Sequence, residues 1–283
     1  MESDREVNVK DRISCSSIFG AVAVISALAA FPARSANAQT ATGEWLALFD
    51  GRSTAGWRGY CRREFPARCW VVEDGALKRL KNAADADCSD IMTDGEYRDF
   101  ELELDYKISA DGNSGIKYFV PEKKPAGWDK LLMEYEIREL RRQAKPGYEK
   151  EISGITPGDF ACFPIGFEYQ LIDDVGNEDA LTGGTHITGA LYDLLAPSRK
   201  AARPAGEFNH VRLVVSGNHV EHWLNGVKVL EFERGSRQFE QAIERSKFRG
   251  MAGFGRISRG HIVLQDHGSE IWFKNIRIRE LRP

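Results

Sequence analysis

The sequence has no strong excess of charge of either sign, and this excludes two broad classes of partner. Its 283 residues hold 39 Lys and Arg against 42 Asp and Glu, so the formal net charge is −3. Such a chain lacks the basic surface field that attracts nucleic acid or an anionic membrane. With 42% hydrophobic residues and 27 Gly it also lacks the polar bias of a disordered protein. The composition predicts a globular, turn-rich protein.

The apolar run near the start of the chain is too short to span a membrane. It covers Ile18–Phe31, about fourteen residues where a spanning helix needs about twenty. The small residues Ala36-Asn37-Ala38 follow it, as at the cleavage site of an export signal. We therefore expect residues 1–38 to be a signal peptide, cut after Ala38, and the mature protein to be periplasmic or secreted. The acidic residues before the run are atypical of such a signal, and a buried helix is the alternative.

Cysteine is scarce, and its spacing does not indicate a zinc site. The chain has five Cys but no Cys-x-x-Cys pair, and no His lies at the close spacing of a zinc ligand. Four cysteines follow the expected cleavage point: Cys61, Cys69, Cys88 and Cys162. An even number in an oxidising compartment is compatible with two disulfides, with three pairings open. Four free, buried thiols are the alternative.

Helical patterns are rare in the mature chain, whereas short alternating segments are frequent. In Phe100–Ile108, the residues Leu102, Leu104, Tyr106 and Ile108 face one side and charged residues face the other. Further segments that we expect to be strands are Gly115–Val120, Phe167–Ile172, Ile187–Leu194, His210–Ser216, His219–Leu224, His261–Gln265 and Glu270–Glu280. Many short strands without intervening helices predict an all-β sandwich or barrel.

Two segments depart from this alternation. Trp128–Gln143 and Ser236–Phe248 place apolar residues near helical spacing, so we expect one or two short helices there. The first lies in a long insertion, residues 121–164, which could form a lid or an oligomer contact. Asn225-Gly226 is a two-residue hairpin signal. No repeat or linker interrupts residues 39–283, which we expect to form a single domain.

Polar residues gather near the ends of several predicted strands. Glu168 and Gln170 are two residues apart on one strand, so a carboxylate and an amide leave the sheet on the same face. The other polar or aromatic residues that attract attention for this reason are Asn113, Lys117, Asp173, Tyr192, His222, Gln265 and His267.

Seven motifs that contain most of these residues resemble those of one family. In chain order they are Leu48-Phe49-Asp50-Gly51, Trp57-Arg58-Gly59, Asn113-Ser114-Gly115-Ile116-Lys117-Tyr118-Phe119, Glu168-Tyr169-Gln170-Leu171-Ile172-Asp173-Asp174, His222-Trp223-Leu224-Asn225-Gly226, Leu264-Gln265-Asp266-His267-Gly268 and Phe273-Lys274-Asn275-Ile276. From about Glu44 to Leu281 the chain resembles the 3-keto-disaccharide hydrolase domain family. The resemblance implies a concanavalin-like jelly roll of two antiparallel sheets and an exported enzyme that acts on glycosides oxidised at C3. The 121–164 insertion looks longer than is usual in that family.

Cleavage of such a substrate requires particular groups. A ketone at C3 acidifies the C2 proton, so that a base can remove it and the enolate can expel the C1 oxygen before water adds. Direct hydrolysis instead uses two carboxylates that flank the bond. We predict Glu168, His267, Lys117 and His222 as catalytic residues, and Gln170, Asp173, Asn113, Tyr192 and Gln265 as substrate-binding residues.

Structural roles and other functions stay open for these residues. Glu168 could pair with a basic side chain, Asp173 could only shape a turn, and His222 could be a half-buried strand histidine. We expect a small carbohydrate as partner and no cofactor, with a divalent cation left open and no prediction of the oligomeric state. The alternative functions are a non-catalytic, lectin-like sugar-binding module and a glycosidase that acts on unoxidised glucan.

Overall fold

The computed structural model describes residues 43–81, 88–143, 152 and 154–281. The expected signal peptide, residues 1–38, lies outside these described residues. The described residues belong to one compact unit within Gln39–Pro283. None of the helices described in that unit has the length and apolar character needed to cross a membrane.

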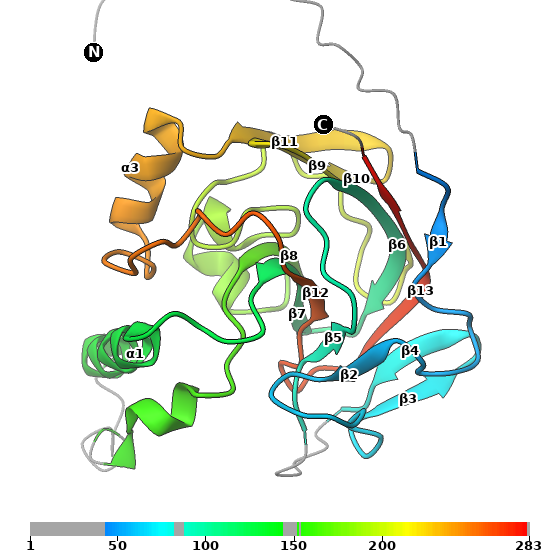
Figure 1. Cartoon of the computed structure of the whole chain (residues 1–283), viewed down its shortest axis with the longest axis horizontal. Helices are drawn as coiled ribbons and strands as arrows, with labels where there is room; N and C mark the ends of the chain where they lie inside the picture. Colours follow the sequence, from blue (N-terminus) through cyan, green and yellow to red (C-terminus); the bar gives the residue numbers. More distant parts are fainter. Residues whose placement is uncertain (1–42, 82–87, 144–151, 153, 282–283) are drawn as a thin grey trace, which may run out of the picture. The chain divides into compact units, whose positions relative to one another are not determined.

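Two antiparallel sheets make up the fold (Figure 1). The eight-stranded sheet has the order β11 (Val227–Glu233), β10 (His219–Leu224), β9 (Asn209–Ser216), β6 (Phe100–Ile108), β13 (Ile271–Glu280), β4 (Ala76–Arg79) and β3 (Trp70–Glu73), with β1 (Leu46–Ala47) paired to β13. The five-stranded sheet has the order β2 (Trp57–Gly59), β5 (Ile91–Thr93), β12 (His261–Leu264), β7 (Asn113–Val120) and β8 (Phe167–Ile172). The predicted all-β, jelly-roll sandwich of two antiparallel sheets is confirmed.

The core lies between the two sheets, because each strand turns every second residue inward. On β6, Leu102, Leu104, Tyr106 and Ile108 are all buried, as the alternation predicts. The five-stranded sheet contributes a matching inner face, with Tyr118 of β7 among its fully buried residues. Each large apolar side chain of this kind contributes roughly 1.5–3 kcal/mol when it leaves water. The opposite face of the five-stranded sheet is therefore free to carry polar groups.

Both predicted helices are present, α1 (Trp128–Gln143) and α3 (Arg237–Arg245). Figure 1 shows them on the same side of the sandwich. The Ser236 hydroxyl caps α3 by accepting a hydrogen bond from the backbone N–H of Phe239 at 3.2 Å. Three short 3₁₀ turns are also described: η1 (Pro157–Phe160), η2 (Asp179–Thr182) and η3 (Gly184–His186).

The hairpin prediction is confirmed, but one strand prediction is wrong. Asn225 and Gly226 have φ values of 51° and 80° and join β10 to β11, as a tight hairpin turn requires. The segment Ile187–Leu194 is not a strand. Gly189 and Asp193 have φ values of 87° and 60°, and this left-handed backbone interrupts any extended run. The segment instead forms a loop that lies against β8 through a bridge between Tyr169 and Leu191.

One disulfide is present among the described residues. It joins Cys69, just before β3, to Cys88, just before β5. Cys61 and Cys162 are exposed thiols. The structure therefore contains one disulfide where the cysteine count is compatible with two, and Cys61 and Cys162 are the other two cysteines of the described residues.

Candidate active site

The outward face of the five-stranded sheet collects most of the predicted polar residues. Across the β7–β8 ladder, Lys117 is opposite Glu168 and Gly115 is opposite Gln170. Directly opposed residues of an antiparallel pair point to the same face, so these side chains leave the sheet together. Gln265 joins them at the end of β12, where its backbone N–H donates to the carbonyl of Gly115 at 3.0 Å.

A cavity of about 420 Å³ lies over this face. Six of the nine predicted site residues line it: Asn113, Glu168, Gln170, Tyr192, Gln265 and His267. Its volume is within the range of small-molecule sites, roughly 300–1,000 Å³. The sequence predicts that Glu168, Gln170, Lys117 and His267 line one groove, together with Asp173, His222 or both. Of these residues, Glu168, Gln170 and His267 line the cavity.

Glu168 is the carboxylate of this cavity that has no fixed partner. Within the described residues its carboxylate makes no hydrogen bond or ion pair. Burial raises the pKa of Glu168 above its ordinary value, and the positive charges of Lys117 and Lys247 oppose that rise. A carboxylate with a raised pKa can take up and release a proton nearer to neutral pH than an exposed one.

Lys247 is a site residue that the sequence did not reveal. It follows the end of α3 and lines the cavity, with its Nζ 4.3 Å from the ring centre of Tyr192. Burial lowers its pKa, while the charges of Glu168 and Asp193 act in the opposite direction. No ion pair to Lys247 occurs in the described part of the chain. No motif marks this position, because a lysine at a helix end is ordinarily a surface residue.

The two other carboxylates of the cavity, Asp90 and Asp266, are held in ion pairs. Lys117 Nζ lies 3.0 Å from Asp90 Oδ2, and Arg79 Nε lies 2.6 Å from Asp266 Oδ1. The backbone N–H of Asp266 also donates to Asp90 Oδ1 at 2.9 Å. Lys117 is buried beneath the cavity by these contacts and does not line it, which corrects its predicted place in the groove.

Several polar atoms of the residues that line the cavity have no hydrogen-bond partner in the described part of the chain. Gln170 Oε1, Gln265 Oε1, Asp266 Oδ2 and Ser89 Oγ are buried and make no hydrogen bond within the described residues. The amide group of Gln170 is held in place by Asn113, whose Oδ1 accepts a hydrogen bond from Gln170 Nε2 at 3.3 Å. A buried acceptor without a donor costs about 1–3 kcal/mol. The cavity therefore suits a ligand rich in hydroxyl donors.

Tyr192 is held in place by a charged network behind the cavity. Its hydroxyl donates to Asp179 Oδ2 at 3.0 Å. His186 contacts the same carboxylate, with Nδ1 2.7 Å from Asp179 Oδ1, and its Nε2 lies 3.4 Å from Asp193 Oδ1. Hydrogen bonds to Asp179 and Asp193 raise the pKa of His186 to about 9. His186 is therefore an imidazolium at neutral pH that orients Tyr192.

Two predicted site residues lie elsewhere. His222 is fully buried between the sheets, with Nε2 2.9 Å from the Tyr118 hydroxyl and Nδ1 3.0 Å from the Gly189 carbonyl. Burial lowers its pKa to about 4, so it is a neutral core residue. Asp173 shapes a turn, since its carboxylate accepts from the backbone N–H groups of Asp111 and Val175 at 2.9 and 3.1 Å. Neither lines the cavity, because these internal contacts occupy their polar atoms.

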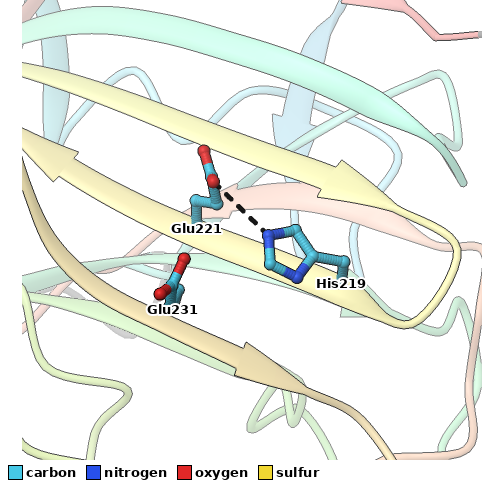
Figure 2. Close-up of side chains that lie close together, drawn as sticks. All are labelled: His219, Glu221 and Glu231. Atoms are coloured by element: carbon cyan, nitrogen blue, oxygen red, sulfur yellow. Dashed lines mark hydrogen bonds and ion pairs between the residues drawn. The ribbon is translucent and has the colours of Figure 1, made fainter. Parts of the chain in front are cut away.

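One group of potential metal ligands lies on the other sheet. Figure 2 shows His219 and Glu221 of β10 beside Glu231 of β11. Lys228 is already bound there: its Nζ lies 3.2 Å from Glu221 Oε1 and also contacts Glu231. A lysine ammonium between two carboxylates supplies the positive charge that a metal ion would bring. We assign this group to an ion-pair network.

Comparison with known proteins agrees with this fold and with the sequence motifs. A protein of Bacteroides thetaiotaomicron named 3-keto-disaccharide hydrolase is 29% identical over 253 residues, which are 84% of this chain and 78% of that protein. A crystal structure from Parabacteroides distasonis, described as that of a candidate glycosyl hydrolase, is 30% identical, with a TM-score of 0.63 over 85% of this chain and 94% of the other. A second structure from that organism, described in the same way, is 25% identical, with a TM-score of 0.55 over 84% of this chain and 100% of the other.

The match to a family covers the whole of the cavity. Residues 44–279 fit the pattern of the 3-keto-alpha-glucoside-1,2-lyase-like domains. This range contains every residue that lines the cavity and both sheets apart from Glu280, the last residue of β13. It confirms the resemblance that the seven motifs indicate. The chain therefore belongs to the family of 3-keto-alpha-glucoside-1,2-lyase-like domains.

Proposed function

We propose that this protein is an enzyme that cleaves the glycosidic bond of 3-keto glycosides by elimination. One observation carries the proposal: the unpartnered carboxylate of Glu168 and the partly buried ammonium of Lys247 share one cavity. The name of the Bacteroides relative, 3-keto-disaccharide hydrolase, supports the same substrate class. The unpartnered acceptors of the cavity suit the hydroxyl groups of a sugar.

In this mechanism Glu168 acts first, as the base that removes the C2 proton. The electron pair of the C2–H bond forms the C2=C3 bond of an enolate, and the ammonium of Lys247 stabilises the enolate oxygen. The enolate then restores the C3 carbonyl and forms a C1=C2 bond, while the C1–O bond breaks and its electron pair leaves with the oxygen. The imidazole of His267, exposed at the cavity mouth, supplies the proton that the leaving oxygen takes up. Addition of water across C1=C2 completes a net hydrolysis.

The state of the neighbouring carboxylates favours elimination over direct hydrolysis. Direct hydrolysis requires a second carboxyl group that is free to act as acid, base or nucleophile. Asp90 and Asp266 are instead held by Lys117 and Arg79. A lectin-like function would not need the raised pKa of Glu168, which disfavours that alternative.

The decisive experiment compares 3-keto-trehalose with trehalose and follows the release of sugar. We expect cleavage of the oxidised sugar only, because the C2 proton of trehalose is not acidified. The variant Glu168→Gln should lose about 10²–10⁴ in rate, since it keeps the shape of the side chain but removes proton transfer. Glu231→Gln, on the exposed edge of the other sheet, is the matched control and should be unaffected. Equal cleavage of both sugars would identify a plain glycosidase, and binding without cleavage would identify a sugar-binding module.

We also propose that the enzyme acts in the periplasm or outside the cell. The apolar run before Ala38 supports this, and so does the Cys69–Cys88 disulfide, because such bonds persist in oxidising compartments. The mature protein isolated from the exported fraction should begin at or near Gln39. Recovery of the exported protein with Met1 still attached would contradict this proposal.

A further inference from the structure

A second cavity, of about 640 Å³, lies between α1 and the end of α3. One wall is α1, which belongs to the 121–164 insertion and contributes Leu131, Tyr135 and Arg138. The other wall is formed by the end of α3 and the residues that follow, including Arg245 and Lys247. Figure 1 shows that both helices stand on one side of the sandwich. The 121–164 segment thus forms one wall of a second cavity.

The second cavity adjoins the catalytic one. Lys247 lines both of them. Asp193 lies at the same junction, because its Oδ2 accepts from the backbone N–H of Lys247 at 2.7 Å. Burial first, and next the charge of Asp193, raise the pKa of Tyr135 to about 12. The two cavities therefore meet at Lys247.

The charge of the second cavity is predominantly positive. Its two glutamates are already paired, Glu134 with Lys130 and Glu244 with Arg249, each at 3.7 Å. In the described ranges neither Arg138 nor Arg245 has a carboxylate within ion-pair distance. The guanidinium of Arg138 instead lies 5.3 Å from the ring centre of Tyr135, so that a flat apolar surface and a cation stand side by side. Arginine in this setting is suited to bind a carboxylate or another planar anion.

We propose that this second cavity binds the leaving group of the substrate, and that the preferred leaving group is an aromatic or sugar unit that carries a carboxylate or a similar anion. Tyr135 and Leu131 contact the body of the leaving group, and Arg138 and Arg245 bind its negative charge. This inference rests on the proposed function, because it assigns the group that departs when the C1–O bond breaks.

The test uses two synthetic substrates that differ in charge and little in shape, para-carboxyphenyl and para-carbamoylphenyl 3-keto-glucoside. The wild-type enzyme should favour the carboxylate, chiefly through KM, by about tenfold, the effect of one charge-assisted contact that is partly exposed to water. The double variant Arg138→Gln/Arg245→Gln should abolish this preference, so that its kcat/KM values for the two substrates agree within about twofold. Arg237→Gln, exposed on α3 and outside both cavities, is the matched control.

Ionic strength gives a second and independent measurement. The preference of the wild-type enzyme should weaken as salt rises from about 0.01 to 1 M, because salt screens exposed charges. A preference that is absent in the wild type, or that is unchanged in the double variant, would overturn the inference while the proposed function stands. Failure to cleave either substrate would instead overturn the proposed function, and this inference with it.

Discussion

The carboxylate arm of Glu168 lies directly over the Cα of Gly115 on the neighbouring strand. A Cβ at position 115 would be 2.7 Å from Glu168 Cγ, closer than any ordinary carbon contact. Glycine at this position therefore leaves the space in which the carboxylate rests, and the pairing of β7 with β8 fixes the two residues relative to each other.

Gly115→Ala should disable the site without unfolding the protein. The added methyl group meets the flexible end of Glu168 and not the backbone, so the carboxylate moves and the sheet stays intact. A displacement of about 1 Å can cost about 10² in rate, and we expect a loss of kcat on 3-keto-trehalose of that order. Gly183→Ala, where no atom lies within 4 Å of the new Cβ, is the matched control. An active Gly115→Ala enzyme would show that Glu168 does not need its present position.

The sequence was sufficient to predict which face of the sheet carries the site, but not how deeply each side chain is buried. Period-two alternation places Glu168 and Gln170 together, and the structure agrees. The same rule applied to β10 places His222 on the face of Val220 and Leu224, which are both buried, so the pattern already favoured a core histidine. Lys247 could not be found in this way, because it reaches the cavity from a loop after α3 and long-range packing decides where that loop lies.

Lys247→Met should move the pH dependence of the reaction. The positive charge of Lys247 opposes the burial that raises the pKa of Glu168, so its removal should raise that pKa further. If Glu168 is the base, it must be ionised to act, and the acidic limb of the kcat/KM profile should shift to higher pH. The maximal rate should fall as well, because the enolate loses its cation. The control Lys228→Met, on the other sheet, should leave the profile unchanged. An acidic limb that does not move in Lys247→Met would show that the charge of Lys247 does not affect the ionisation of Glu168.

His222 should make the protein sensitive to mild acid. Its pKa is lowered from the ordinary value of 6.5 to about 4 in the folded state. The unfolded chain therefore binds a proton at a higher pH than the folded one does, so this contribution to stability is complete above about pH 6.5 and is lost as pH falls towards 4. Urea unfolding of the wild type between about pH 6.5 and pH 4 should show this decrease in the free energy of unfolding. In His222→Gln the pH dependence of the free energy of unfolding should be reduced, although the variant is less stable at neutral pH. His210→Gln, which changes an exposed histidine, should keep the pH dependence of the wild type.

Cys61 and Cys162 should form the second disulfide when the protein meets a small disulfide oxidant such as oxidised glutathione. Both side chains line the catalytic cavity. The Cys61 Sγ donates to the carbonyl of Ala161, the residue before Cys162, at 3.7 Å. Thiol–disulfide exchange would transfer their two electrons to glutathione and release it as two reduced molecules.

This reaction should be slow at neutral pH. Burial first, and then the contact with Cys162, raise the pKa of the Cys61 thiol to about 12, and only the thiolate attacks a disulfide. The rate of oxidation should therefore increase with pH up to the most alkaline conditions in which the protein stays folded. A digest under non-reducing conditions should yield a linked pair of peptides containing Cys61 and Cys162, and the pair should be absent from Cys162→Ser. If the oxidised wild type keeps two alkylatable thiols at every pH tested, the side chains do not approach closely enough to bond, and the single Cys69–Cys88 bridge is the full disulfide complement of the mature domain.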